Sequence, residues 1–306
     1  MKALITGSLG FVGGYLRKEL EANGYDVTGV DIRPGEKTIQ ADLTKAEDVL
    51  NVVRTVQPDI IIHLAGQASV ARSWEIPQKT FEINVICAIN LMEAVRQVNP
   101  VIRMVLVGSS DQYGNLGEKG VSVSEKLDTR PQTPYAVSKK AQEEISGVYV
   151  RAYGLQICMT RSFNHGGAGQ RTGFLIPDFA SGIVCVERGE AECLKVGNLT
   201  SKRDFTHVKD VVRAYRLIAE KGRAGEIYNV GSGRTYSAQE ILDRLRAMAQ
   251  CEIPVEQDPT KMRPSVTPVI CCDHSKLTKD TGWEPECGLD MILTDTLEYY
   301  RRQEKA

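Results

Sequence analysis

The stretch that decides the fold is KALITGSLGFVGG, residues 2–14. Its opening apolar run, residues 2–6, predicts a strand, and residues 11–24 have the periodicity of a helix. Between the two, Gly7, Gly10 and Gly13 are spaced G-x-x-G-x-x-G. Glycines in such a turn let the backbone approach a pyrophosphate, whose charge then lies at the helix N-terminus. The stretch therefore predicts a dinucleotide-binding turn.

The first half of the chain continues in an alternating pattern. Short β-rich runs are expected at residues 26–30, 59–65, 103–110 and 155–161, with helical periodicity between them. A strand–helix–strand rhythm is typical of a parallel sheet covered on both faces. From about residue 165 the pattern loosens into loops that carry glycine and proline.

The domain organisation that follows is an α/β protein with a doubly wound parallel sheet and a smaller C-terminal α/β lobe. We expect a dinucleotide-binding domain over residues 1–163, joined by parts of 204–235. Residues 164–306 would form the smaller, discontinuous lobe that binds the substrate.

Composition excludes several classes of protein. The 306 residues carry 38 basic and 39 acidic side chains, with no block of like charge that would favour nucleic acid or an anionic membrane. The apolar run at the N-terminus is short and broken by glycines, and the best candidate for a membrane span, residues 59–66, is far too short. We expect a cytoplasmic protein.

Eight cysteines form no Cys-x-x-Cys pair, which favours reduced thiols in the cytoplasm. The four histidines are not spaced as metal ligands, so no metal site is expected.

Asp31 lies at the end of the second expected strand, where an acid can accept hydrogen bonds from an adenosine ribose. The same carboxylate would repel a 2′-phosphate. NAD(H) is therefore favoured over NADP(H). Arg33, two residues later, could soften that repulsion, so NADP(H) stays possible.

TPYAVSKKAQ, residues 133–142, places Tyr135 and Lys139 one helical turn apart. Such a pair arises easily by chance in a chain with eleven tyrosines. Beside a nicotinamide, however, an ammonium about 4 Å from a phenol could lower its pKa by up to roughly three units, which would make the phenol a useful proton donor or acceptor.

GSSDQYG, residues 108–114, follows the fifth expected strand. It offers the hydroxyls of Ser109 and Ser110 at a strand's C-terminal end, where doubly wound sheets place their sites. A turn or a helix cap is the alternative explanation for each serine.

These motifs together carry a resemblance. TGSLGFVGG, HLAGQASV, NV at residues 84–85, SSDQYG and YAVSK resemble the extended short-chain dehydrogenase/reductase family, which has a Rossmann fold and acts on nucleotide sugars. The resemblance covers nearly the whole chain. RSFNHGGAGQ (161–170), VGNLTSKRDFTHVKDVVRAY (196–215), YNVGSG (228–233) and MRPSVTPVI (262–270) are similar to the branch of GDP-mannose 4,6-dehydratases and GDP-4-keto-6-deoxymannose reductases. RSFNH, GNL before RDF, and RPS look closest to the reductases.

The resemblance implies site residues of three kinds. Tyr135 would be the catalytic acid–base, Lys139 its activator and ribose anchor, and Ser109 a hydrogen-bond partner of the sugar C4 oxygen. The cofactor would be held by Gly7, Gly10, Phe11, Val12, Gly13, Asp31, Arg33, Asp42, Leu43, Leu64, Ala65 and Gly66, with Tyr135 and Lys139. The substrate side would comprise Ser110, Asp111, Asn164, Arg203 and Arg263. Ser110 is also the less favoured alternative to Ser109. A guanidinium can grip a diphosphate through two hydrogen bonds, although an ordinary surface ion pair would also explain either arginine.

The expected activity is a reductase that transfers hydride to C4 of a 4-keto-6-deoxy nucleotide sugar, with a GDP-linked substrate and GDP-D-rhamnose as product. Alternatives are a GDP-mannose 4,6-dehydratase or another nucleotide-sugar epimerase or dehydratase. A remote alternative is a non-catalytic dinucleotide-binding regulator, which would have no need of Ser109, Tyr135 and Lys139. The resemblance also implies a homodimer that pairs through helices within residues 77–98 and 134–153, although packing on a sheet would equally explain their apolar residues.

Overall fold

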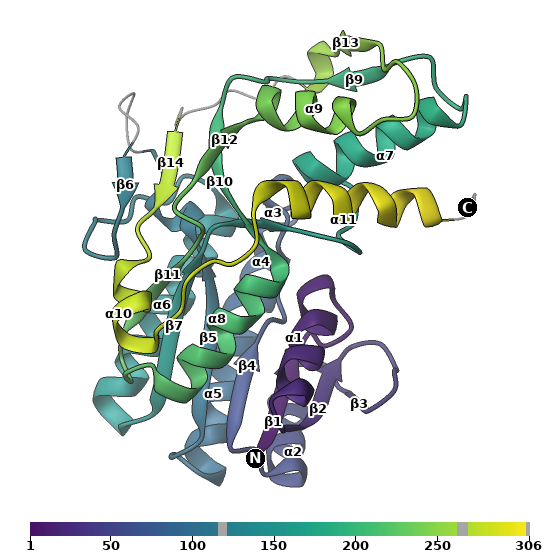
Figure 1. The fold of residues 1–306 in the computed structure, drawn as a ribbon. Coiled ribbons are helices and arrows are strands. Elements are labelled where there is room, and N and C mark those ends of the chain that lie inside the picture. Colours follow the sequence, from purple (N-terminus) through teal and green to yellow (C-terminus); the bar gives the residue numbers. More distant parts are fainter. Residues whose placement is uncertain (116–120, 262–268, 304–306) are drawn as a thin grey trace.

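The computed structural model describes residues 1–115, 121–261 and 269–303. A seven-stranded sheet, with helices on both faces, carries a smaller lobe at one end (Figure 1). Its strand order is β11-β7-β5-β4-β1-β2-β3, and every neighbouring pair is parallel. The strands are β1 (Lys2–Thr6), β2 (Asp26–Asp31), β3 (Thr38–Gln40), β4 (Ile60–His63), β5 (Arg103–Ser109), β7 (Gln156–Ser162) and β11 (Ile227–Val230). The predicted doubly wound α/β fold is confirmed.

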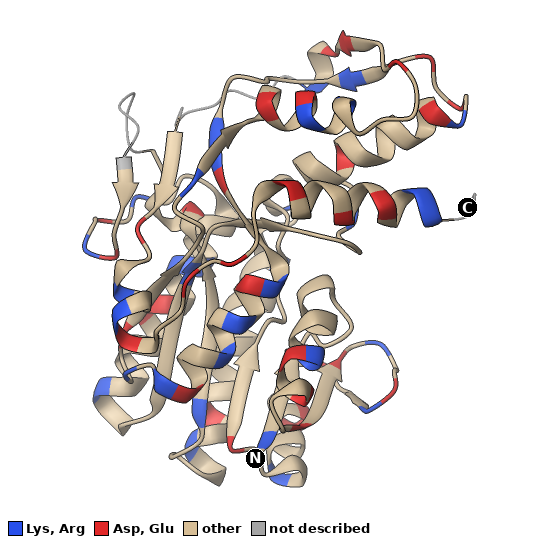
Figure 2. Cartoon of the chain, in the orientation of Figure 1, with Lys and Arg blue, Asp and Glu red and all other residues tan. Residues whose placement is uncertain are grey.

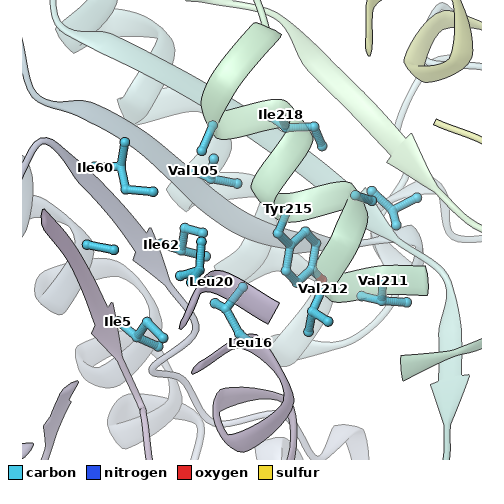
Figure 3. Close-up of a cluster of buried hydrophobic side chains, with 14 of the residues drawn as sticks. Ile5, Leu16, Leu20, Ile60, Ile62, Val105, Val211, Val212, Tyr215 and Ile218 are labelled. Atoms are coloured by element: carbon cyan, nitrogen blue, oxygen red, sulfur yellow. The ribbon is translucent and has the colours of Figure 1, made fainter. Parts of the chain in front are cut away.

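Two apolar layers hold helices against this sheet. One face is covered by α1 (Phe11–Ala22), α8 (Val208–Lys221) and α10 (Ser275–Thr281), whose core with the strands is seen in Figure 3. The other face is covered by α2 (Ala46–Val56), α5 (Cys87–Val98) and α6 (Pro134–Tyr153). Strand β4 shows why the strands are continuously apolar: Ile60 and Ile62 enter the first layer and Ile61 the second.

Short helices connect the strands near the carboxyl edge of the sheet. They are α3 (Val70–Glu75), α4 (Pro77–Phe81), the π-helical turn η1 (Glu82–Ile86) that runs into α5, and the 3₁₀ turn η2 (Ser110–Tyr113) that follows β5.

The smaller lobe has its own sheets and core. A five-stranded sheet contains β12 (Thr235–Ser237), β10 (Lys202–His207), β14 (Val269–Cys272), β6 (Val121–Val123) and β8 (Asn164–Gly166). A two-stranded sheet pairs β13 (Val255–Gln257) with β9 (Leu194–Val196). The helices are α7 (Leu175–Glu187), α9 (Ala238–Ala247), α11 (Leu289–Arg302) and the 3₁₀ turn η3 (Pro259–Lys261). Apolar residues of α7, α9 and α11 form a separate core.

The chain crosses more than once between the domain of the seven-stranded sheet and the smaller lobe. Strand β6 leaves the first half of the chain to join the second sheet, whereas α8, β11 and α10 return to the first. Helix α8 and strand β11 lie within residues 204–235, parts of which were expected to join the dinucleotide-binding domain. The boundary between residues 163 and 164 stays a prediction.

Charged side chains of both signs are interspersed over both bodies (Figure 2). Within the described ranges, none of the helices combines the length and the apolarity needed to cross a bilayer.

Candidate active site

The glycine turn between β1 and α1 is built for close approach. Gly7 has a φ of 69°, and its N–H donates to Val30 O at 2.8 Å. A Cβ on Gly7 would lie 2.9 Å from the Cα of Ala65, and one on Gly13 would lie 2.6 Å from Gly7 O. Gly10 caps α1 without any side-chain hydrogen bond, so the first N–H groups of the helix are left for a ligand. The turn therefore fits a pyrophosphate.

Asp31 ends β2 beside this turn. Its carboxylate accepts hydrogen bonds from Leu9 N at 3.2 Å and from Arg33 Nε at 3.0 Å. Burial alone would raise the pKa of Asp31, but the hydrogen bonds from Arg33 and Leu9 lower it below its ordinary value. The Arg33 side chain is 61% exposed, so it can move without disturbing the core. The pair places one acid and one cation where a ribose is expected.

The rest of the expected cofactor wall lies at the ends of β3 and β4. The Thr6 hydroxyl accepts from Ala65 N at 3.2 Å, which fixes the turn after β4. Asp42 accepts from both the N–H and the hydroxyl of Thr44, while the carbonyl of buried Leu43 accepts from Asn90. Leu64, Ala65 and Gly66 follow β4 directly, and all three are at least partly accessible.

Ser109 and Tyr135 meet at the carboxyl end of β5. Ser109 is the N-cap of η2, and its hydroxyl accepts from Asp111 N at 3.2 Å. The same side chain lies close enough to the phenol of Tyr135, at the start of α6, to lower the pKa of that phenol. Ser109 is thus both the cap suggested as an alternative and the partner of the tyrosine. Ser110, the first residue of η2, is also buried.

Tyr135 differs from expectation in one respect. Burial and the charge of Asp111 raise the pKa of its phenol, opposed by the hydrogen bond from Ser109. Lys139 does not offset this, because its Nζ is turned toward β5 and donates to Val107 O at 2.8 Å and to Gln142 Oε1 at 3.1 Å. Burial lowers the pKa of Lys139 to about 8. The activating role of Lys139 therefore stays a prediction.

The expected substrate side is only partly brought together. The Asp111 side chain is exposed. The protein packed around it nevertheless desolvates its carboxyl group and raises its pKa, whereas the nearby charge of Arg203 opposes that rise. Arg203 lies on β10 and is half-buried, so the smaller lobe brings a cation to the Ser109–Tyr135 pair. Asn164 lies on β8 and is exposed. Arg263 is outside the described residues.

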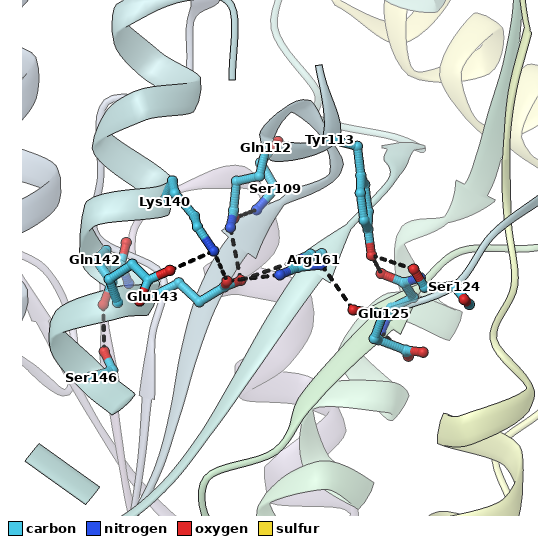
Figure 4. A network of polar contacts seen from close by, with 12 residues as sticks. Ser109, Gln112, Tyr113, Ser124, Glu125, Lys140, Gln142, Glu143, Ser146 and Arg161 are labelled. Carbon is cyan, nitrogen blue, oxygen red and sulfur yellow. Dashed lines mark hydrogen bonds and ion pairs between the residues drawn. The ribbon is translucent and has the colours of Figure 1, made fainter. Parts of the chain in front are cut away.

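Sequence reasoning missed a buried network behind Ser109 (Figure 4). Gln112 Oε1 accepts from Ser109 N at 3.1 Å, and Gln112 Nε2 donates to Glu143 Oε2 at 2.8 Å. Arg161 of β7 completes the network with two hydrogen bonds of 2.8 Å to the Glu143 carboxylate, and its guanidinium stacks on Tyr113. The network ties β5, β7 and α6 together. In the sequence, only the helical spacing of Glu143 four residues after Lys139 hints at it.

Asn84, in the π-helical turn η1, belongs to the Asn-Val pair that carries part of the resemblance, but sequence reasoning assigned it no role. Its Oδ1 accepts from Gln67 N at 2.8 Å, and its Nδ2 donates to Ser138 Oγ at 2.9 Å. It therefore joins the turn after β4 to the helix that carries Tyr135 and Lys139. Such turns often mark functional sites, but the sequence pattern does not distinguish one from an ordinary helix.

In the part of the chain that the structure describes, no three His, Cys, Asp or Glu side chains are grouped so that they could hold a metal ion.

A parallel sheet with a glycine turn after β1, a serine at the end of β5 and a Tyr-x-x-x-Lys helix defines the class: this is an extended short-chain dehydrogenase/reductase, as predicted. The family model described as GDP-mannose 4,6 dehydratase matches residues 4–296, and the chain belongs to that family.

Individual relatives agree with this assignment. The chain is 32% identical to the GDP-6-deoxy-D-mannose reductase of Pseudomonas aeruginosa over 293 residues, which cover 95% of this chain and 94% of the relative. The structure of RMD from Pseudomonas aeruginosa complexed with NADPH superimposes with a TM-score of 0.89 at 31% identity and covers 98% of both chains. The UDP-glucose 4-epimerase of Thermus thermophilus, in complex with NAD, gives 0.88 at 28% identity and covers 99% of both chains.

Proposed function

We propose that this chain reduces the 4-keto group of GDP-4-keto-6-deoxy-D-mannose to give GDP-D-rhamnose. The observation that carries the proposal is that Ser109, at the carboxyl end of β5, lies close enough to the phenol of Tyr135 to lower its pKa, so that the two hydroxyls can face one substrate oxygen. The likeness to the GDP-6-deoxy-D-mannose reductase supports the choice of substrate.

The chain's residues fit a nicotinamide cofactor, which supplies the hydride when bound. The glycine turn fits its pyrophosphate, because a Cβ at Gly7 or Gly13 would collide with backbone. Gly66 lies beside Lys139, since a Cβ there would lie 3.5 Å from Lys139 Nζ, which puts the ammonium at the turn after β4 where the cofactor ribose is expected. Asp31 is available for the adenosine ribose.

At the sugar, Tyr135 donates its phenolic proton to the C4 oxygen as negative charge develops there. Ser109 donates a hydrogen bond to the same oxygen and stabilises that charge. Tyr135 is protonated at neutral pH, as a proton donor must be, although its raised pKa makes it a weaker acid than a free phenol. Lys139 holds the ribose and supplies the positive charge that compensates for the phenolate left behind.

For the choice of nicotinamide we propose NADH over NADPH. Asp31 is ionised and lies where a 2′-phosphate would be placed. Arg33 neutralises part of that charge through its ion pair, so NADPH should bind, but less tightly. The relatives support either cofactor, because one solved structure contains NADPH and another NAD.

The alternative, a GDP-mannose 4,6-dehydratase, shares the family but needs a second base for the C5 proton. In the resembled dehydratases that position is a glutamate, whereas here it is Asp111, one methylene shorter. A misplacement of about 1 Å can cost about a hundredfold in rate. The shorter acid favours the reductase.

The test is to incubate the protein with GDP-4-keto-6-deoxy-D-mannose and NADH, and separately GDP-mannose with NAD⁺ or NADP⁺. We expect steady oxidation of NADH in the first reaction and GDP-D-rhamnose as its product. Conversion of GDP-mannose to the 4-keto sugar at an enzymatic rate would make the dehydratase the better assignment.

We also propose a cytoplasmic homodimer. Phe81 and Ile86, in the stretch from α4 to η1, and Val137 and Val148 on the neighbouring α6 are 37–44% exposed. Covering such apolar side chains with a second copy would remove them from water. We expect a dimer at micromolar concentration by sedimentation, converted to monomer by Val148→Glu. Val101→Glu, on an exposed turn, is the control that should leave the dimer intact. A monomeric wild-type protein would refute the pairing.

A further inference from the structure

Gln142 lies one turn beyond Lys139 on α6, and it is 2% exposed. Its Oε1 accepts from Lys139 Nζ at 3.1 Å. An ammonium has only donors, so it must meet the oxygen of the amide and not the nitrogen, which fixes the orientation of the whole side chain. The amide nitrogen then points away from the lysine.

That nitrogen is one of the buried polar atoms in the described chain without a hydrogen-bond partner. A small cavity of about 10 Å³ is lined by Gln142 and Glu143 of α6, Gly108 of β5, Thr160 of β7, Lys139, Leu106 and Met159. Because its accessible lining is almost entirely apolar, it does not supply the polar partners that a buried water molecule needs. A buried amide N–H left without an acceptor would be costly.

We propose that Gln142 is a positioning residue for Lys139, held by the bond from the ammonium to its Oε1 although its buried amide nitrogen has no hydrogen-bond partner among the described residues. Val107 O and Gln142 Oε1 engage two of the three N–H bonds of the ammonium. The third N–H is left for the cofactor ribose, and Gly66 borders the ammonium, since a Cβ there would lie 3.5 Å from Nζ. This deepens the proposed function and rests on the role that it gives to Lys139.

The other titratable groups around Lys139 are neutral or paired, so Gln142 is the neighbour at which a substitution changes the local charge. His63 of β4 is neutral, because burial and the lysine charge lower its pKa to about 3. Glu143 of α6 is neutralised by its bidentate pair with Arg161 of β7. Tyr135 of α6 stays protonated, and Asp111 after β5 faces Arg203. A change of charge at Gln142 should therefore be felt directly by the lysine.

The experiment measures kcat and KM of the reductase from pH 6 to 10 in Gln142→Met and Gln142→Glu, with Gln239→Met on exposed α9 as control. Deprotonation of Lys139 should limit activity on the alkaline side, because burial lowers its pKa to about 8. Loss of the acceptor in Gln142→Met should lower kcat roughly tenfold and move the alkaline limb to lower pH. The carboxylate of Gln142→Glu should move the limb to higher pH.

Opposite shifts of the limb in the two variants are the expected result, since a merely structural role would change thermal stability without moving the limb. Suppose that the wild-type enzyme is active and Lys139→Met is inactive. An unmoved alkaline limb of the pH profile in both Gln142 variants would then overturn the proposal and leave the reductase assignment intact. A wild-type protein without reductase activity, or a fully active Lys139→Met, would instead overturn the proposed function.

Discussion

The proposed catalytic side and the proposed substrate side of the site are built in opposite ways. The catalytic side belongs to the seven-stranded sheet, and Ser109, Tyr135 and Lys139 are all less than a tenth exposed. The substrate side belongs largely to the smaller lobe, where Asn164 is exposed and Arg203 half-buried. The first is held by a buried network and the second lies at the surface of strands β8 and β10. The difference suggests that the fold fixes the chemistry, whereas the lobe can vary the sugar nucleotide.

The largest expected effect is at the proton donor. Tyr135→Phe keeps the ring and its packing but removes the transferable proton, so kcat should fall by about 10²–10⁴-fold. Cofactor binding, measured by fluorescence titration, should be nearly unchanged. Tyr153→Phe, at the exposed end of the same helix, is the matched control. Near-normal turnover in Tyr135→Phe would remove the tyrosine from the mechanism.

The network behind Ser109 should come next. Glu143→Ala leaves the Arg161 guanidinium buried without its partner, which should lower the free energy of unfolding by about 3–5 kcal/mol. The neighbouring Glu144→Ala, whose side chain is 67% exposed, should cost less than about 1 kcal/mol. Urea denaturation of the two variants decides the point. Equal stabilities would mean that the buried pair does not hold the catalytic side together.

A smaller effect is expected on the substrate side. Arg203→Ala should raise KM for the GDP-sugar roughly tenfold or more, because a charged hydrogen bond to the diphosphate is lost. Since Arg203 does not take part in proton transfer, kcat should change much less. Lys202→Ala, on the preceding exposed position of β10, serves as control. A fall in kcat with unchanged KM would move Arg203 to the catalytic side of the comparison.

The smallest effect concerns cofactor choice. Removing the guanidinium in Arg33→Ala exposes a 2′-phosphate to the full charge of Asp31, so Kd for NADPH should rise several-fold while Kd for NADH changes little. Lys37→Ala, on the loop before β3, is the control. Should wild-type protein bind NADPH more tightly than NADH, the preference proposed from Asp31 would be wrong.

The sequence predicted best the features that depend on local pattern. The glycine turn lies between adjacent elements, and β1 begins and ends at the predicted residues 2–6. The helix expected within residues 134–153 is α6, with the same bounds. Local propensity and hydrophobic periodicity decide such elements, so one sequence is enough.

Contacts between distant residues could not be predicted in the same way. Gln112 and Glu143 are 31 residues apart, and Glu143 and Arg161 are 18 apart, so only the packing of β5, β7 and α6 brings them together. The position of the Lys139 ammonium, which was expected near the Tyr135 phenol, could not be predicted for a related reason. Helical spacing placed it on the face of Tyr135, but a carbonyl of β5, invisible in that spacing, determines where its ammonium points.

The central claim is that hydride is delivered to C4 while Tyr135 protonates the oxygen. The most direct measurement uses NADH carrying deuterium at the transferred position, GDP-4-keto-6-deoxy-D-mannose as substrate, and NMR of the isolated product. The account predicts one deuterium at C4 of the 6-deoxyhexose in the wild type, and very little labelled product with Tyr135→Phe. A product without deuterium at C4, or with the label at C6, would contradict it.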